Sequence, residues 1–155
     1  MTEISFQFIG ITSVGLLVLA IILMLLRRTR NAAIIVSSLA VLTLTFYIVN
    51  LWIGLQRPPL RTLGETRLWY GFFLSLLGVL LWFRWKYIWL FIYANVTAGV
   101  FIIIDLLNPA ALDQTLMPAL QSVWFVPHVV IYIIGYALLG MSAIVAAIRL
   151  LMPLF

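Results

Sequence analysis

The residue whose chemistry stands out is His128, the only histidine in the chain. It lies near the start of the apolar run "SVWFVPHVVIYIIGYALLG" and directly follows Pro127. Tyr132, Tyr136 and Gly140 come after it at intervals of four, so in a helix they share one stripe with the histidine. An imidazole backed by two phenols and a glycine is suited to form the wall of a cofactor site.

A packing role is the alternative for the same residues. His128 would then be hydrogen-bonded to a neighbouring helix or to water, and the tyrosines and the glycine would serve helix packing. One histidine makes at most one bond to a metal, and no catalytic triad can be assembled around it. The chain has no cysteine, which excludes disulfides, thiolate metal sites and thioether attachment of a cofactor to the chain itself.

Three arginines in the stretch "QRPPLRTLGETR" are the second candidate group: Arg57, Arg61 and Arg67. A guanidinium matches the geometry of a carboxylate, so these side chains favour acidic lipid headgroups or a ligand that carries carboxylates. The alternative is that they are ordinary interfacial arginines and that Glu65 is their partner.

The composition indicates how these residues are held in place. With 66% hydrophobic and 8% charged residues and a mean hydropathy of +1.24, the chain cannot cover its apolar surface as a soluble globule. The basic residues lie at the ends of apolar runs rather than on one polar face, which argues against a nucleic-acid partner. We therefore predict an all-α integral membrane protein whose surroundings are the lipid bilayer.

Five apolar runs are long enough, or nearly so, to cross a hydrocarbon core of about 30 Å. They cover residues 4–26, 32–55, 68–83, 88–104 and 124–148. The turn "RWKYIW" predicts a tight hairpin between the third and fourth runs. The first run lacks the features of a signal peptide, so we expect it to be retained. The prediction is a single polytopic domain over residues 1–155, with outer loops at 56–67 and 105–123.

Charge predicts the orientation of these runs. An outer N-terminus and a cytoplasmic C-terminus place six of the nine basic residues in the cytoplasm, as the positive-inside rule favours. All four acids then lie outside. We expect Trp52, Trp69 and Trp124 at the outer interface, and Trp82, Trp85 and Trp89 at the inner one.

The spans contain few polar residues. Hydroxyls and amides in the second and fourth runs are expected to bond across helices. These are Ser37, Ser38, Thr43, Thr45, Asn50, Asn95 and Thr97. No acid is expected deep in a span, which argues against an ion-coupled transporter.

Two stretches resemble a known family. "RPPLRTLGETR", followed by a span, a hairpin and "TLMPALQSVWFVPHVVIYIIGYALLG", is similar to the N-terminal half of the CcsA (ResC) proteins of System II cytochrome c biogenesis, in their Bacteroidetes-type form. The specific parts are the run from Leu116 to Ser122 and the histidine that enters the next span. The likeness extends from about Gln56 onward, and before that point only the hydropathy matches.

The resemblance implies a function. CcsA proteins work with a CcsB (ResB) partner in the bacterial inner membrane, where they move heme b across the bilayer and join it to apocytochrome c. Two histidines that flank a tryptophan-rich "WWD" segment hold the heme iron, and His128 corresponds to the first of them. In a heme-handling component Trp124, Tyr132 and Tyr136 would wall the heme site, and Arg57, Arg61 or Arg67 would reach the heme propionates.

The chain also departs from that family. It has no Trp-Gly-x-x-Trp-x-Trp-Asp segment and no second histidine, and "WFRWKYIW" is expected at the cytoplasmic interface. The chain would then be one piece of a split CcsA, a truncated product, or a relative that has lost the chemistry. At most it would be part of a heme lyase complex, insufficient without a polypeptide that carries the WWD half. The alternative is a non-catalytic structural membrane subunit.

Overall fold

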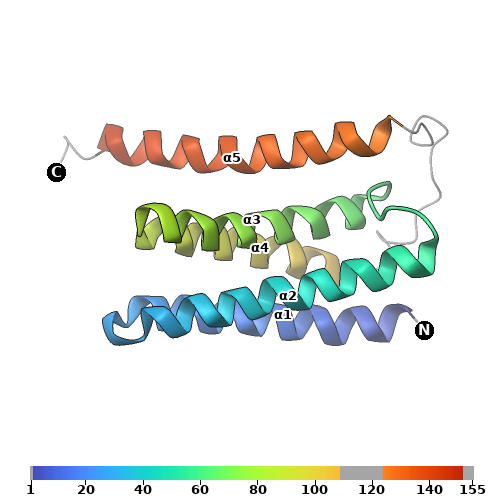
Figure 1. Cartoon of the computed structure of the whole chain (residues 1–155), viewed down its shortest axis with the longest axis horizontal. Coiled ribbons are helices and arrows are strands. Elements are labelled where there is room, and N and C mark those ends of the chain that lie inside the picture. Colours follow the sequence, from blue (N-terminus) through green and yellow to red (C-terminus); the bar gives the residue numbers. More distant parts are fainter. Residues whose placement is uncertain (1, 109–123, 152–155) are drawn as a thin grey trace.

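The computed structural model describes residues 2–108 and 124–151, and within them the chain forms helices and no strand (Figure 1). The helices are α1 (Thr2–Leu25), α2 (Arg30–Leu55), α3 (Leu63–Trp85), α4 (Ile88–Leu107) and α5 (Phe125–Leu151), with a short 3₁₀ turn, η1 (Arg27–Thr29), after α1. All five α-helices are long and apolar enough to cross a membrane. The predicted all-α architecture with five helices of spanning length is confirmed, while membrane insertion and orientation stay predictions.

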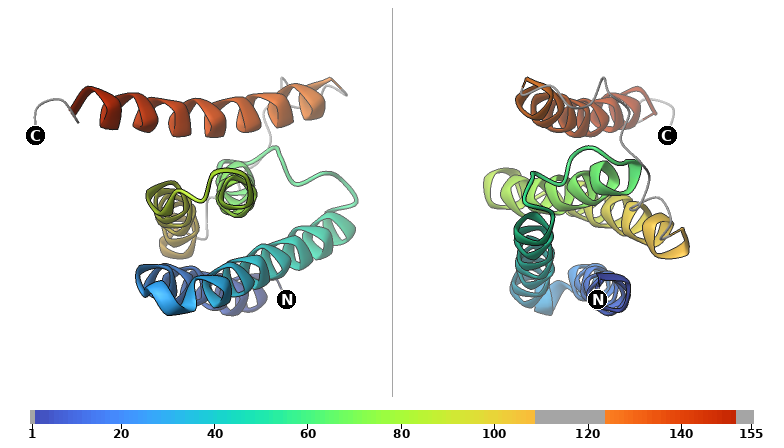
Figure 2. Two further views of the ribbon diagram at one scale, coloured as in Figure 1. Left: turned by 60° about the vertical axis from the view of Figure 1, so that its left-hand side comes forward. Right: turned by 90° about the vertical axis from the view of Figure 1, so that its right-hand side faces the viewer.

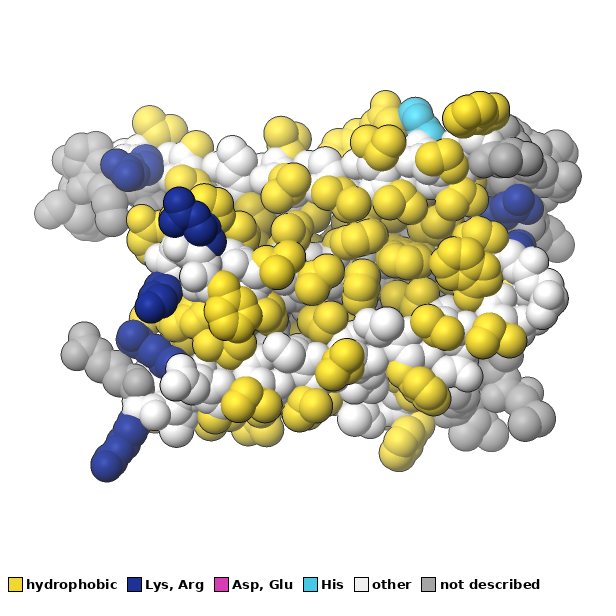
Figure 3. Space-filling model, viewed as in Figure 1, with side chains coloured by type: hydrophobic (Ala, Val, Ile, Leu, Met, Phe, Trp, Pro, Cys, Tyr) yellow, Lys and Arg dark blue, Asp and Glu magenta, His cyan; other side chains and the backbone are white. Residues whose placement is uncertain are grey.

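Successive helices run in opposite directions, because each connection within the described residues is short (Figure 1). Figure 2 shows α1 and α2 in one layer, α3 and α4 in a second, and α5 in a third beside α3. Hydrophobic side chains cover the middle of the molecule and the basic side chains gather at its two ends (Figure 3). This distribution suits a bundle whose long axis crosses a bilayer.

Helices α3 and α4 pack closely, and small residues make this approach possible. A Cβ added at Gly78 would lie only 2.8 Å from the Cβ of Ala94, so the two backbones approach more closely than a larger residue allows. The predicted hairpin between them is confirmed. Lys86 ends α3 in the left-handed conformation (φ 54°), and α4 begins two residues later.

Two helices extend beyond the apolar runs that predicted them. Helix α3 begins at Leu63 rather than at residue 68, because Thr62 and Glu65 form a capping box at its start. Helix α4 continues to Leu107, so Asp105 is a buried helical residue rather than part of an outer loop. The rest of the second predicted outer loop, 109–123, lies outside the described residues, and with it the motif from Leu116 to Ser122.

The structure adds detail to two expectations about side chains. Trp82, expected at the inner interface, is 8% exposed and packs edge-on against Phe91, with 6.2 Å between the ring centroids. Its depth in a membrane stays a prediction. Among the seven polar residues expected to bond across helices, the structure shows one such bond, 2.8 Å from Ser37 Oγ to Asn95 Oδ1. The others with a hydrogen bond donate to a carbonyl four residues earlier in their own helix: Thr43, Thr45, Asn50 and Thr97.

Candidate functional site

His128 lies in the first turn of α5 with its side chain exposed. Pro127 precedes it at the third helical position, where a missing N–H breaks no helical hydrogen bond. The imidazole centroid is 4.4 Å from the ring of Tyr132, which in turn is 5.7 Å from Tyr136. The imidazole makes no hydrogen bond within residues 2–108 and 124–151.

Below the histidine, the outward face of α5 is hollowed. The hollow has a volume of about 300 Å³ and is lined by Ile131, Tyr132, Gly135, Tyr136 and Leu139. Gly135 contributes to it by lacking a side chain, since a Cβ there would meet no atom within 4 Å. The ladder of one imidazole and two phenols therefore borders an open, mostly apolar surface.

Gly140 does not continue this ladder, although the spacing places it four residues after Tyr136. A helix has 3.6 residues per turn, so each step of four rotates the position by about 40°. After three steps Gly140 has turned into the bundle, where a Cβ would lie 3.5 Å from the hydroxyl of Tyr93 on α4. Trp124 lies just before α5 and is 81% exposed.

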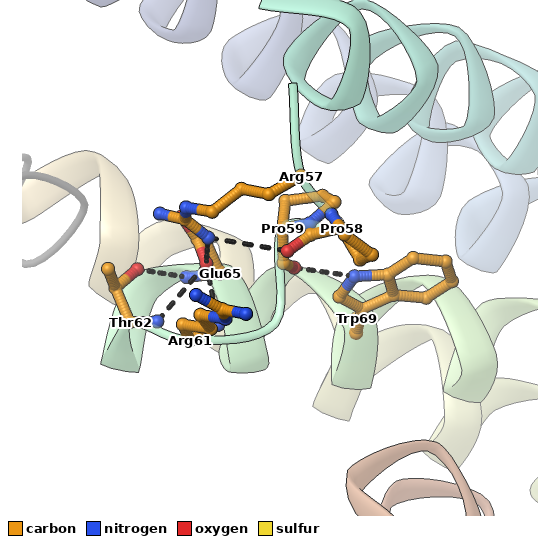
Figure 4. A network of polar contacts seen from close by, with 7 residues as sticks. All are labelled: Arg57, Pro58, Pro59, Arg61, Thr62, Glu65 and Trp69. Atoms are coloured by element: carbon orange, nitrogen blue, oxygen red, sulfur yellow. Dashed lines mark hydrogen bonds and ion pairs between the residues drawn. The ribbon is translucent and has the colours of Figure 1, made fainter. Parts of the chain in front are cut away.

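The arginine loop is organised around one buried carboxylate (Figure 4). Glu65 is 1% exposed and accepts two hydrogen bonds from the Arg57 guanidinium, at 3.0 and 2.8 Å. Its Oε2 also accepts the backbone N–H groups of Arg61 (2.7 Å) and Thr62 (3.1 Å). Trp69 fastens the loop from the other side by donating its indole N–H to the Pro59 carbonyl at 2.7 Å.

Arg67 is also paired within the protein. Its guanidinium donates to Asp105 Oδ1 at 3.0 Å, which joins α3 to α4. The other oxygen of Asp105, Oδ2, is buried and has no hydrogen-bond partner among the described residues. Of the three arginines, only Arg61 makes no ion pair within that part of the chain, and its Nε is buried without a partner.

The structure brings together part of the predicted site. His128, Tyr132 and Tyr136 form a contiguous ladder. Arg57 and Arg61 lie on the loop between α2 and α3, and Arg67 lies near the start of α3. This loop is at the end of the bundle where α5 begins (Figure 1). Within the described ranges, no hydrogen bond, ion pair or ring contact joins these arginines to His128. Glu65 already binds Arg57, as the alternative interpretation of the loop expected, and the propionate contacts stay a prediction.

The side chains of the candidate site can supply one ligand to a heme iron. They do not form a complete metal site. A single exposed imidazole supplies one axial nitrogen. The described residues contain no group of three or more His, Cys, Asp or Glu side chains that could hold a metal ion. His128 is the one histidine of this sequence, so a second axial imidazole would have to come from another polypeptide.

Two other features of the fold were not anticipated. The capping box could have been found from Thr62-x-x-Glu65, which is a recognised signal for a helix start. The tyrosines Tyr70 and Tyr93 border a cavity beside α5, and no spacing within one helix could have indicated this.

Comparison with known proteins adds no relative: no family model, no curated protein and no solved structure matches the chain. The resemblance to the CcsA proteins therefore depends on the residues that carry it.

Proposed function

We propose that the chain is a heme-handling membrane component of cytochrome c maturation. It would work in the bacterial inner membrane with a CcsB-like protein and with a polypeptide that supplies the WWD segment and the second histidine. The observation that supports this most directly is the exposed imidazole of His128, which lies tilted against the ring of Tyr132 and makes no hydrogen bond in the described residues. A polar ring at a membrane-facing position is costly unless something binds it.

In this proposal heme is the substrate, and its vinyl groups become the thioether links of the product. His128 gives one nitrogen lone pair to the iron, and its second nitrogen must be satisfied so that the correct tautomer is held. Tyr132 and Tyr136 border the heme ring, and Gly135 leaves room for that ring because it has no side chain. Arg61 is the arginine best placed to take a propionate, because Arg57 and Arg67 already bind Glu65 and Asp105.

The alternative function is a structural subunit in which His128 packs against a partner helix. The two proposals predict different effects when the imidazole of His128 is removed by substitution. A ligand mutant loses heme and keeps its assembly, whereas a packing mutant loses assembly and keeps heme in whatever complex remains.

The test is hemin binding to the purified chain in lipid nanodiscs, followed by the Soret band. Replacing His128 with alanine should weaken saturable binding at least about tenfold, since even outer-shell partners of metal ligands contribute that much. Added imidazole should partly restore the spectrum by filling the vacated position. Tyr87→Ala is the matched control, because Tyr87 is an exposed ring stacked on Trp89 at the other end of the bundle, with centroids 5.8 Å apart.

An unchanged Soret band in the His128→Ala protein would contradict the ligand assignment. The proposed need for a partner is tested separately with a reporter apocytochrome. The chain alone should not mature it in cells that lack their own biogenesis proteins. Maturation by the chain alone would mean that the second ligand had been misassigned.

The proposed orientation has its own test. A single cysteine at Gln56, which is exposed beside the arginine loop, should react with a membrane-impermeant thiol reagent in intact spheroplasts. A cysteine at Asn31, exposed at the opposite end of α2, should react only after lysis. The reverse pattern would invert the topology.

A further inference from the structure

A second cavity lies on the inward side of α5, between α3, α4 and α5, and has a volume of about 410 Å³. Its lining includes Tyr70 from α3, Tyr93, Thr97 and Phe101 from α4, and Tyr136 and Gly140 from α5. It is distinct from the hollow below His128, although Tyr136 borders both.

The cavity lies well inside the helices. Tyr70 is seven residues from the start of α3, Tyr93 is five from the start of α4, and Tyr136 is eleven from the start of α5. At 1.5 Å per residue these are depths of about 10, 8 and 16 Å from the helix ends. In a bilayer whose core is about 30 Å thick, a molecule in this cavity would have to be soluble in lipid.

The cavity offers hydrogen-bond donors that the described residues leave unmatched. The hydroxyls of Tyr70, Tyr93 and Tyr136 make no hydrogen bond to any described residue. Thr97 already donates its proton to the Tyr93 carbonyl at 2.9 Å, so it does not compete as a donor. Because water is scarce at this depth, these phenols favour a ligand that brings its own acceptor oxygens.

The walls restrict the ligand further. Tyr70 and Phe101 are stacked with ring centroids 5.4 Å apart and 21° between their planes, so they present flat aromatic surface. None of the described lining residues is charged, and none is a histidine, cysteine or methionine that could bind heme iron. The volume lies near the lower end of the range for small-molecule sites. A neutral, flat ring with carbonyl oxygens meets all of these conditions.

We propose that this cavity binds the ring of a lipid-soluble quinone, whose carbonyl oxygens accept hydrogen bonds from the tyrosine hydroxyls. The isoprenoid tail would leave the ring towards the lipid beside α5. The proposal is independent of the heme function, because Tyr93 and Gly140 border this cavity and do not border the hollow below His128.

The test uses 2-methyl-1,4-naphthoquinone labelled with ¹³C at its carbonyls and the full chain in detergent micelles. Isotope-edited infrared difference spectra should show a saturable carbonyl band at lower frequency than that of free quinone in the same micelles. Tyr93→Phe removes one donor and should raise the Kd about threefold to tenfold, with loss of part of the band shift.

Gly140→Leu provides a steric test. A leucine there would extend past the Tyr93 hydroxyl into the cavity and should abolish saturable binding. Gly15→Leu is its control, because Gly15 is exposed on α1 with nothing within 4 Å of an added Cβ, and it should bind quinone like the parent. Circular dichroism and gel filtration of each variant establish that it is folded.

Three results would overturn the proposal. The first is an unshifted carbonyl band, which would mean simple partition into the micelle. The second is a shifted band that Tyr93→Phe and Gly140→Leu both leave intact. The third is native mass spectrometry of the purified protein that finds a phospholipid which added quinone does not displace. Hemin binding in these variants is expected to match the parent, so failure here is distinguishable from failure of the heme proposal.

Discussion

The polar side chains of helices α1 to α4 and those of helix α5 lie in different surroundings. In the first four helices and their connections, several polar side chains are paired inside the protein: Ser37 binds Asn95, Arg57 binds Glu65 and Arg67 binds Asp105. In α5 the imidazole of His128 and the phenols of Tyr132 and Tyr136 lie on exposed surface. Only 17% of the apolar window of α5 is buried, against 28–39% in the other four helices.

This difference suggests a division of work between the two parts. The four-helix body is fastened by ion pairs at one end and by close small-residue packing along α3 and α4, so its stability is largely its own. Helix α5 adds two hollows, one on each side, and side chains that suit a ligand or a partner. Substitutions in the body away from the cavity should therefore change mainly stability, and substitutions on the outward face of α5 should change mainly binding.

The largest effect is expected at the α3–α4 contact. Gly78→Leu introduces a side chain whose first carbon would already lie 2.8 Å from the Cβ of Ala94, so the two helices must separate. We expect little or no folded protein in the membrane fraction, measured as monodisperse material after detergent extraction. Gly15→Leu, on an open face of α1, should accumulate normally. Normal accumulation of both variants would mean that the helices are not this close.

The second effect concerns the buried carboxylate. Glu65→Ala removes the capping box and leaves Arg57 without its partner, which should lower the free energy of unfolding by about 2–4 kcal/mol. The effect is measured by denaturant titration in mixed micelles. Thr66→Ala is the control, since Thr66 bonds only within its own helix and should change the value by less than about 0.5 kcal/mol. If Glu65→Ala lowered the free energy of unfolding by as little as Thr66→Ala does, Glu65 would not be the residue that holds the loop in place.

The sequence was sufficient to predict the body of this fold and not its contacts. Hydropathy identifies helices of spanning length because a bilayer favours long apolar segments. The five helices and the hairpin between α3 and α4 were predicted from that pattern. Hydropathy does not show how a helix is rotated about its own axis, since all faces of such a helix are apolar. For this reason Trp82 was expected at an interface and is in fact buried. The boundary at Leu63 was missed because a capping residue extended the helix beyond its apolar run.

The candidate site was predictable only within single helices. The ladder from His128 to Tyr136 follows from a spacing of four, which holds over two steps and fails at Gly140 as the helix rotates. The cavity bordered by Tyr70, Tyr93 and Tyr136 draws on three helices. The residue spacing within one helix does not show how another helix is rotated about its axis. A cavity formed by several helices can therefore be found only once their packing is known.

A smaller effect is expected where two helices share a hydrogen bond in the core. Asn95→Ala removes the acceptor of Ser37 Oγ and should lower the free energy of unfolding by about 1 kcal/mol, because membrane hydrogen bonds are individually modest. Thr97→Ala, two residues later, loses only a bond to its own helix and should be close to neutral. Equal losses in the same denaturant titration would mean that the bond between the helices contributes nothing beyond helix packing.

The smallest change in stability, and one of opposite sign, is expected at Gly135. A Cβ there meets no atom within 4 Å, and leucine replaces a glycine in a helix interior, so Gly135→Leu should raise the free energy of unfolding by about 0.5–1 kcal/mol. The same leucine fills the hollow below His128 and should weaken hemin binding, because the room for the ring is lost. Gly78→Leu and Gly135→Leu make the same chemical change in the two regions, so their opposite signs would separate the packed body from the open helix. A Gly135→Leu protein that is strongly destabilised would mean that this face of α5 is covered, and that its exposed rings serve packing rather than a ligand.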